Sequence, residues 1–251
     1  MNDNSLYKYI LMLGDNAMIL GHRLSELCGH GPSLETDIAL TNISLDLFGQ
    51  VRNYFQYAAE IKGADFDEDK IAFMRLEHDY RNTLLVEQKN TDFAFVIARQ
   101  YFFDAYHILL LNELINSKNE QIAAIAAKSI KEVKYHRRFS SEWVKRLGDG
   151  TDVSREKMQN AVNYLFPYLN ELTEETELEK EMKENGIGAD LNKIRKIYFE
   201  NIKALLTEAT LKIPENIFSH SGGKKGVHSE HMGYILSNLQ YMQRAYPNMT
   251  W

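Results

Sequence analysis

Five acidic and imidazole side chains on the predicted helices are of the types that bind metal ions inside helical bundles. They are Asp46, Asp104, His107, Glu132 and His136. A pair of metal ions in such a bundle takes one Glu from each of two helices and a Glu-x-x-His pair from each of the other two, because residues i and i+3 share a helix face. The chain departs from this rule. Tyr135 stands where the histidine after Glu132 is required, and Gly49 stands in the corresponding place after Asp46.

These five residues allow two hypotheses. In the first, they bind metal through unusual geometry, and the protein is a di-metal oxygenase or ferroxidase. In the second, which we favour, they form a polar layer of hydrogen bonds and ion pairs inside a bundle, since buried carboxylates and histidines persist when they are paired. The second hypothesis predicts neither a catalytic residue nor a metal ion in this chain.

A glycine- and lysine-rich segment, SGGKKGVHSEH at residues 221–231, is the other candidate site. It precedes a predicted helix, and a helix N-terminus beside lysines can bind an anion such as a nucleotide phosphate or a carboxylate of a partner. Lys224 and Lys225 are the candidate ligands. The segment is not a P-loop, because neither lysine is followed by Ser or Thr and no strand precedes it. His228 and His231 have the spacing of two metal ligands, but further ligands are not evident.

Helical periodicity predicts the elements that position these residues. The predicted helices cover residues 6–27, 34–62, 93–115, 120–147, 154–172, 191–211 and 230–246. Ser33 can cap the second helix and Gly63 can end it, while Ser154 can cap the fifth. The predicted buried face of the second helix includes Ile38, Leu45, Phe48, Val51 and Phe55. An acidic stretch, residues 174–184, is expected to be a solvated helix face.

The first four long helices predict an all-α four-helix bundle over about residues 5–147, with additional helices over about 153–251. Only 4 Pro and 14 Gly occur in 251 residues, and no linker-like stretch is present, so we expect one domain over 1–251. The helix over 93–115 is apolar around most of its circumference, so it should be central. Its aromatic residues are then expected in the core. These are Tyr101, Phe102, Phe103 and Tyr106.

Composition excludes several classes of protein. The formal net charge of −6 argues against nucleic-acid binding, which usually needs a basic surface. No apolar run approaches the ~20 residues of a membrane span, so a cytoplasmic protein is expected. The single Cys28 cannot form an internal disulfide.

Several separated motifs, in the same order along the chain, resemble one family. They are LGDN at 13–16, LFGQVRN at 47–53, ARQYFFDAYH at 98–107, AAKSIKEVKYHRRFS at 126–140, GDGTDVS at 148–154 and GGKKGVHSEH at 222–231. By these motifs, over about residues 6–251, the chain is similar to the PaaC subunits of bacterial phenylacetyl-CoA 1,2-epoxidases.

The resemblance implies a ferritin-like fold and a non-catalytic structural role in a multicomponent oxygenase. In that family, a related subunit, PaaA, holds a di-iron site and epoxidises the aromatic ring of phenylacetyl-CoA. A reductase subunit with flavin and an iron–sulfur cluster supplies electrons from NADPH. The resemblance thus implies no cofactor in this chain and PaaA among its partners. It also makes a phosphate of coenzyme A, or a partner, the expected contact of Lys224 and Lys225.

A third class of function stays open beside the structural subunit and the di-metal enzyme. The chain could be a stand-alone homodimer that binds an acyl-CoA. Affinity for coenzyme A in the absence of PaaA would distinguish it. The isolated chain could also form a homodimer that takes the place of the natural pair.

Overall fold

The computed structural model describes residues 3–215, 217–247 and 249, and no strand occurs among them. The first half contains α1 (Asp3–Ser25), α2 (Leu34–Lys62), α3 (Glu68–Phe73), α4 (Leu84–Glu87), α5 (Phe93–Leu114) and α6 (Glu120–Gly148). The second half contains α7 (Asp152–Leu165), α8 (Leu169–Thr173), α9 (Glu177–Glu184), α10 (Leu191–Glu208) and α11 (Glu230–Ala245). Three short 3-10 turns lie at Glu77–Asp79, Phe166–Tyr168 and Gly223–Lys225. The all-α prediction is confirmed.

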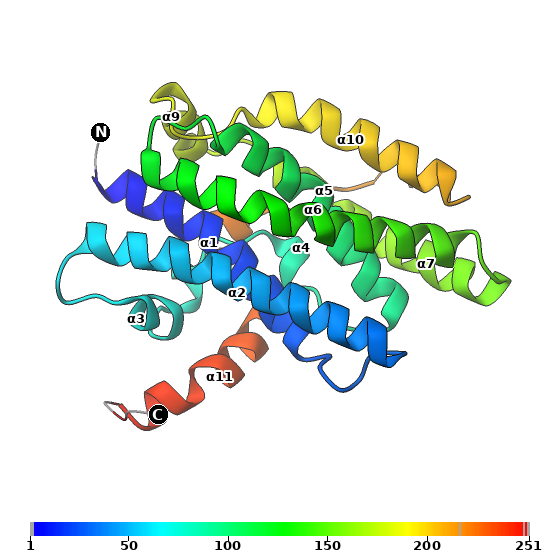
Figure 1. The fold of residues 1–251 in the computed structure, drawn as a ribbon, viewed down its shortest axis with the longest axis horizontal. Helices are drawn as coiled ribbons and strands as arrows, with labels where there is room; N and C mark the ends of the chain where they lie inside the picture. Colours follow the sequence, from blue (N-terminus) through cyan, green and yellow to red (C-terminus); the bar gives the residue numbers. More distant parts are fainter. Residues whose placement is uncertain (1–2, 216, 248, 250–251) are drawn as a thin grey trace.

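Four long helices, α1, α2, α5 and α6, form the bundle (Figure 1). α1 packs mainly on α2, and α5 packs mainly on α6. Contacts between α2 and α6 join the two pairs. The additional helices α7 and α10 pack against α5, so this helix is covered on several sides. The predicted core aromatics of α5 are all buried, namely Tyr101, Phe102, Phe103 and Tyr106.

The limits of α2 follow from its local sequence. The backbone N–H of Thr36 donates to Oγ of Ser33 over 3.3 Å, which caps the first turn. Gly63 ends the helix with φ of 109°, a value that favours glycine. Both limits were predicted. The predicted face was partly wrong, because Ile38 and Leu45 are 50% and 61% exposed.

The fifth predicted helix is divided into separate pieces. Thr151, rather than Ser154, is the N-cap of α7, since the N–H of Ser154 donates to Oγ1 of Thr151 over 3.2 Å. Pro167 lies in the 3-10 turn that follows α7, where it interrupts the α-helical hydrogen bonds before α8 begins. The shortened pieces let the chain turn back along α5.

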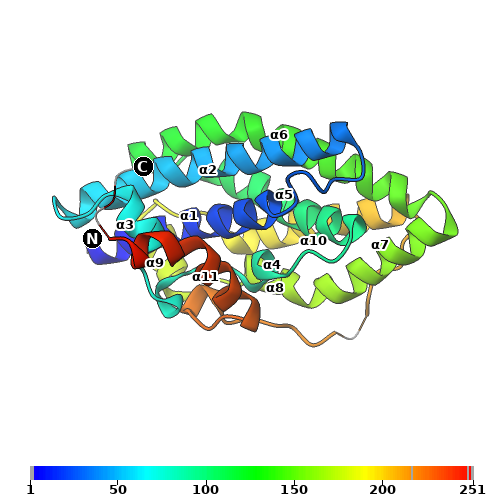
Figure 2. The ribbon, with the colours of Figure 1, turned by 90° about the horizontal axis from the view of Figure 1, so that it is seen from below.

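The C-terminal helix α11 lies apart from the four bundle helices, on one side of the molecule, where it contacts α3 (Figure 2). Within the described residues, no helix combines the length and apolar composition that a bilayer crossing requires.

Candidate functional site

The five candidate metal ligands lie where α2, α5 and α6 face one another. Nε2 of His136 is 2.9 Å from Oδ2 of Asp46. One turn away, the side-chain amide of Gln50 donates to Oε2 of Glu132 over 3.0 Å. These two contacts join α2 to α6. They also give the carboxylates of Asp46 and Glu132 hydrogen-bond partners within the chain.

Asp104 is fully buried on α5 and accepts two hydrogen bonds. Nε2 of Gln100 and Oγ of Ser140 each donate to one of its carboxylate oxygens over 2.7 Å. Burial raises the pKa of Asp104 to about 7, while the positive charge of His136 and the two hydrogen bonds limit the rise. Asp104 thereby links α5 to α6.

His107 lies one turn further along α5 and is also buried. Burial first, and then the charge of His136, lower the pKa of His107 to about 3, so its ring is neutral near pH 7. The ring centroid lies 5.0 Å from that of Phe103. Nδ1 of His107 has no hydrogen-bond partner among the described residues.

We call these five residues, together with Gln50, Gln100 and Ser140, the polar layer. The polar layer does not fit a di-iron centre. Such a centre needs several carboxylates and an imidazole for each ion. Here, two side-chain amides and one hydroxyl donate to the carboxylates instead. Among the described residues, no group of three or more His, Cys, Asp or Glu side chains is placed to hold a metal ion. The layer can instead hold three helices together through hydrogen bonds.

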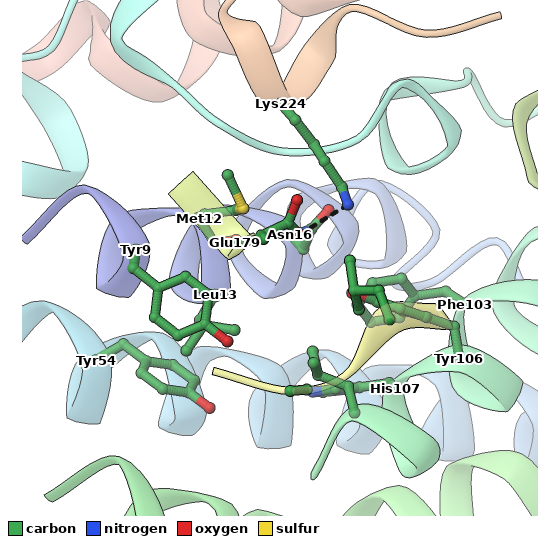
Figure 3. A pocket seen from close by; sticks show the side chains of 13 residues that line it. Tyr9, Met12, Leu13, Asn16, Tyr54, Phe103, Tyr106, His107, Glu179 and Lys224 are labelled. Carbon is green, nitrogen blue, oxygen red and sulfur yellow. Dashed lines mark hydrogen bonds and ion pairs between the residues drawn. The ribbon is translucent and has the colours of Figure 1, made fainter. Parts of the chain in front are cut away.

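A small enclosed cavity lies beside the polar layer (Figure 3). Its volume of about 20 Å³ suffices for roughly one water molecule. Three tyrosines, Tyr9, Tyr54 and Tyr106, line it together with His107. The cavity is too small for an aromatic ring or a nucleotide, so it is no substrate pocket.

The two candidate lysines of the 221–231 segment lie in different environments. Lys225 is exposed, whereas Lys224 is buried and its Nζ lies 2.8 Å from Oε1 of Glu179. The side chains of this ion pair are only 4% and 7% exposed, and Nζ also donates to the carbonyl of Glu174 over 2.9 Å. This corrects two expectations. Lys224 does not present its charge at the surface, and the acidic stretch is not wholly solvated, because Glu179 faces inward.

Two further buried acids, Glu171 and Glu87, fix the same segment to the bundle. Glu171 accepts hydrogen bonds from the backbone N–H groups of Leu84 and Gly222, over 2.7 Å and 2.8 Å. Glu87 accepts from the N–H and the hydroxyl of Ser229, over 2.8 Å and 2.6 Å. Residues 222–229, which we call the anchoring segment, therefore connect α4, α8 and α9. The glycines and polar residues of the anchoring segment stabilise the fold.

His228 belongs to this anchoring segment and is held on both sides of its ring. Nδ1 lies 2.5 Å from a carboxylate oxygen of Glu87, and Nε2 lies 3.1 Å from the carbonyl oxygen of Tyr80. Both neighbours are acceptors, so both ring nitrogens donate and the ring is cationic. Desolvation is the largest single effect and lowers the pKa of His228, but the hydrogen bond to Glu87, the negative charge of Glu87 and the hydrogen bond to Tyr80 together outweigh it, so the net pKa is raised. With both nitrogens engaged, His228 is not free to bind metal with His231.

The sequence interpretation missed the residues that support these sites. Asp15, in the LGDN motif, is fully buried and pairs with Arg75. Its neighbour Asn16 accepts a hydrogen bond from the N–H of Thr83 over 2.9 Å. Glu87 and Glu171 each lie beside apolar residues within short helices. A single acid among apolar residues was the available signal, because such an acid is buried only with partners.

Comparison with known proteins agrees with these motifs. The model of the family described as "Phenylacetic acid catabolic protein" (PaaA_PaaC) matches residues 1–251. A curated relative, which is named as one of the subunits of the 1,2-phenylacetyl-CoA epoxidase of Escherichia coli (strain K12), is 49% identical over 248 residues. The match covers 99% of this chain and 100% of that protein. The chain belongs to the phenylacetic acid catabolic protein family.

Proposed function

We propose that this chain is a non-catalytic structural subunit of a multicomponent phenylacetyl-CoA oxygenase. In this proposal it pairs with a di-iron catalytic subunit, PaaA, which epoxidises the aromatic ring. A reductase subunit with flavin and an iron–sulfur cluster would deliver electrons from NADPH. A cytoplasmic location is part of the proposal, because the complex draws on NADPH and a coenzyme A thioester. The 49% identity to a named epoxidase subunit supports membership in such a complex.

The observation that carries the non-catalytic role is the state of the polar layer. Each of its three carboxylates already has partners in the chain: His136 for Asp46, Gln50 for Glu132, and Gln100 with Ser140 for Asp104. Binding iron would require these contacts to break, and the amide and hydroxyl groups would be poor replacements for imidazole ligands.

In this proposal, the subunit supports the catalytic subunit by holding it in position, which requires that its own helices are rigid. The polar layer ties together α2, α5 and α6, and the anchoring segment fixes the shorter helices to this frame. A rigid neighbour can hold the helices of a catalytic subunit at the geometry that the reaction needs. An obligate contact of this kind buries upwards of ~2,000 Å².

Iron content and oxygen-dependent turnover of phenylacetyl-CoA test the proposal. Both should be measured for this chain alone, for PaaA alone and for the mixture, with reductase and NADPH present. We expect negligible iron in this chain, and full turnover only in the mixture. About two iron ions per chain, with turnover by this chain alone, would overturn the proposal in favour of a di-metal oxygenase. Coenzyme A affinity of the isolated chain, measured by calorimetry, would support the acyl-CoA-binding homodimer.

A further inference from the structure

The outer face of α2 and α6 lacks a covering element. Figure 2 shows the two helices side by side along one edge of the molecule, with no other described helix beyond them. They run antiparallel, since Asp46 pairs with His136 while Gln50, further along α2, pairs with Glu132, earlier on α6. Each helix therefore presents a stripe of side chains to the outside over several turns.

The outer stripe of α2 is apolar. Leu34, Ile38 and Leu45 are 71%, 50% and 61% exposed. Their spacing of four and seven residues places them on one side of the helix, opposite Leu40 and Leu47 in the core. From Leu34 to Leu45 the stripe is about 16 Å long. Exposed aliphatic side chains that share one helix face are typical of interaction surfaces.

The outer stripe of α6 is basic. It contains Lys128, Lys131, Lys134 and Arg138, all of them exposed and three or four residues apart. In the part of the chain that the structure describes, none of the three lysines takes part in an ion pair. This local excess of positive charge stands out in a chain of net charge −6.

An aromatic residue on α6 adds to this face. The guanidinium of Arg138 lies 5.9 Å from the ring centroid of Tyr135, which is 40% exposed. Tyrosine and arginine are among the residue types that most often dominate protein interfaces, because they bury large areas and still form polar contacts. The polar layer reaches the surface at the same seam, where the side chain of Asp46 is 38% exposed.

From these stripes we infer that the α2/α6 face, namely Leu34, Ile38, Leu45, Lys128, Lys131, Lys134, Tyr135 and Arg138, is the docking surface for the catalytic subunit. The inference rests on the proposed function and specifies its contact. The inference requires an apolar helix ridge beside an acidic one on the matching surface of PaaA, so that opposite charges meet across the contact.

Two other occupants fit the face less well. A second copy of the chain would bring the same basic stripe, and repulsion between like charges would oppose the contact. A coenzyme A phosphate would satisfy the lysines, but a nucleotide has no apolar surface of the length that α2 presents.

Two variants test the surface in the full-length protein. In one, Leu45→Asp places a charge in the apolar stripe, and in the other, Lys131→Glu and Lys134→Glu together reverse the basic one. The control combines Val153→Asp and Lys157→Glu on α7, where Val153 is 64% exposed. All of these positions are exposed, so circular dichroism and thermal melting should match the original chain.

Affinity for the catalytic subunit should be measured by calorimetry at low and high salt, together with turnover of the mixture. We expect Leu45→Asp to weaken binding about 100-fold. The double lysine variant should weaken it about tenfold and reduce its salt dependence. The control should bind within about twofold of the original chain.

The inference fails if both variants bind the catalytic subunit as tightly as the original chain. It fails equally if they abolish only a homodimer, or only affinity for coenzyme A. If the original chain is required for turnover while the variants bind normally, the proposed function stands and this surface alone is wrong. If turnover never requires the chain, the proposed function itself is wrong.

Discussion

Lys224 and Lys225 are adjacent in the sequence, yet their energetic roles should differ. Replacing Lys224 with Met leaves Glu179 buried without its ion-pair partner, which should lower the free energy of unfolding by about 3 to 5 kcal/mol. Lys225 is exposed, so Lys225→Met should change that free energy by no more than about 0.5 kcal/mol. Urea denaturation of both variants measures the difference. Equal stabilities would show that the buried ion pair contributes nothing.

Asp104 predicts a pH dependence of stability. Its pKa in the folded protein, about 7, is raised above the ordinary value of 3.8. The stabilisation is therefore complete below pH 4 and is lost as the pH rises towards and through 7, because the folded protein binds this proton more tightly than the unfolded chain. Asp104→Asn removes the titrating carboxyl group, and with it the loss of stability at high pH. The variant should therefore be more stable than the original chain by about 1 to 3 kcal/mol at pH 8.

Unfolding midpoints of the two proteins from pH 4 to 8 measure this effect, and they should diverge as the pH rises. The same variant, assembled with the catalytic subunit, should retain turnover, since Asp104 has no metal to hold in our proposal. Loss of turnover in a stably folded Asp104→Asn complex would favour the metal-site hypothesis for the polar layer.

At the scale of elements, two glycines should respond in opposite ways to alanine. A Cβ at Gly223 would lie 2.2 Å from the carbonyl oxygen of Asn82 and 3.1 Å from the backbone nitrogen of Leu84. Gly223→Ala should therefore displace the anchoring segment and lower stability by about 2 to 4 kcal/mol. A Cβ at Gly49 would meet nothing within 4 Å, so Gly49→Ala in α2 should raise stability by about 1 kcal/mol.

Chemical denaturation measures both glycine variants, and limited proteolysis locates the change. Only Gly223→Ala should speed cleavage around residues 217–229. If cleavage of that variant is no faster than that of Gly49→Ala, the close approach of Gly223 to Asn82 does not constrain the segment.

The elements could be predicted well where local chemistry determines them. Ser33 and Gly63 fixed the limits of α2 through capping and backbone conformation, which depend on neighbouring residues only. The exposed positions of Ile38 and Leu45 could not be predicted in the same way. α2 carries apolar residues on two sides, and only tertiary packing decides which side faces the core.

The contacts of the candidate sites were harder to predict than the helices. The side chains of Gln50 and Glu132 meet across 82 residues of sequence, and Lys224 meets Glu179 across 45. Local periodicity contains no signal for such partners. The glycine- and lysine-rich segment suggested that Lys224 contacts an anion or a partner, whereas Lys224 pairs with the buried Glu179 of the same chain.

At the scale of the whole molecule, the docking surface predicts that assembly stabilises the chain. A partner that binds only the folded state adds about 2.7 kcal/mol when its free concentration is 100 times the Kd. The midpoint of thermal unfolding should therefore rise as catalytic subunit is added. Differential scanning fluorimetry of a singly labelled chain measures the shift, and Leu45→Asp should show a much smaller one at the same concentrations.

The anchoring segment has a consequence for the order in which the protein is made. Glu87, Glu171 and Glu179 all precede residues 222–229 in the chain, so the ribosome produces three future interior acids before their partners in the anchoring segment exist. Until those residues emerge, burial would leave each carboxylate without part of its hydrogen bonds or its ion pair, so water must take the place of the missing donors. The anchoring segment therefore completes the interior, and fragments released before it is made would be open substrates for cellular proteases.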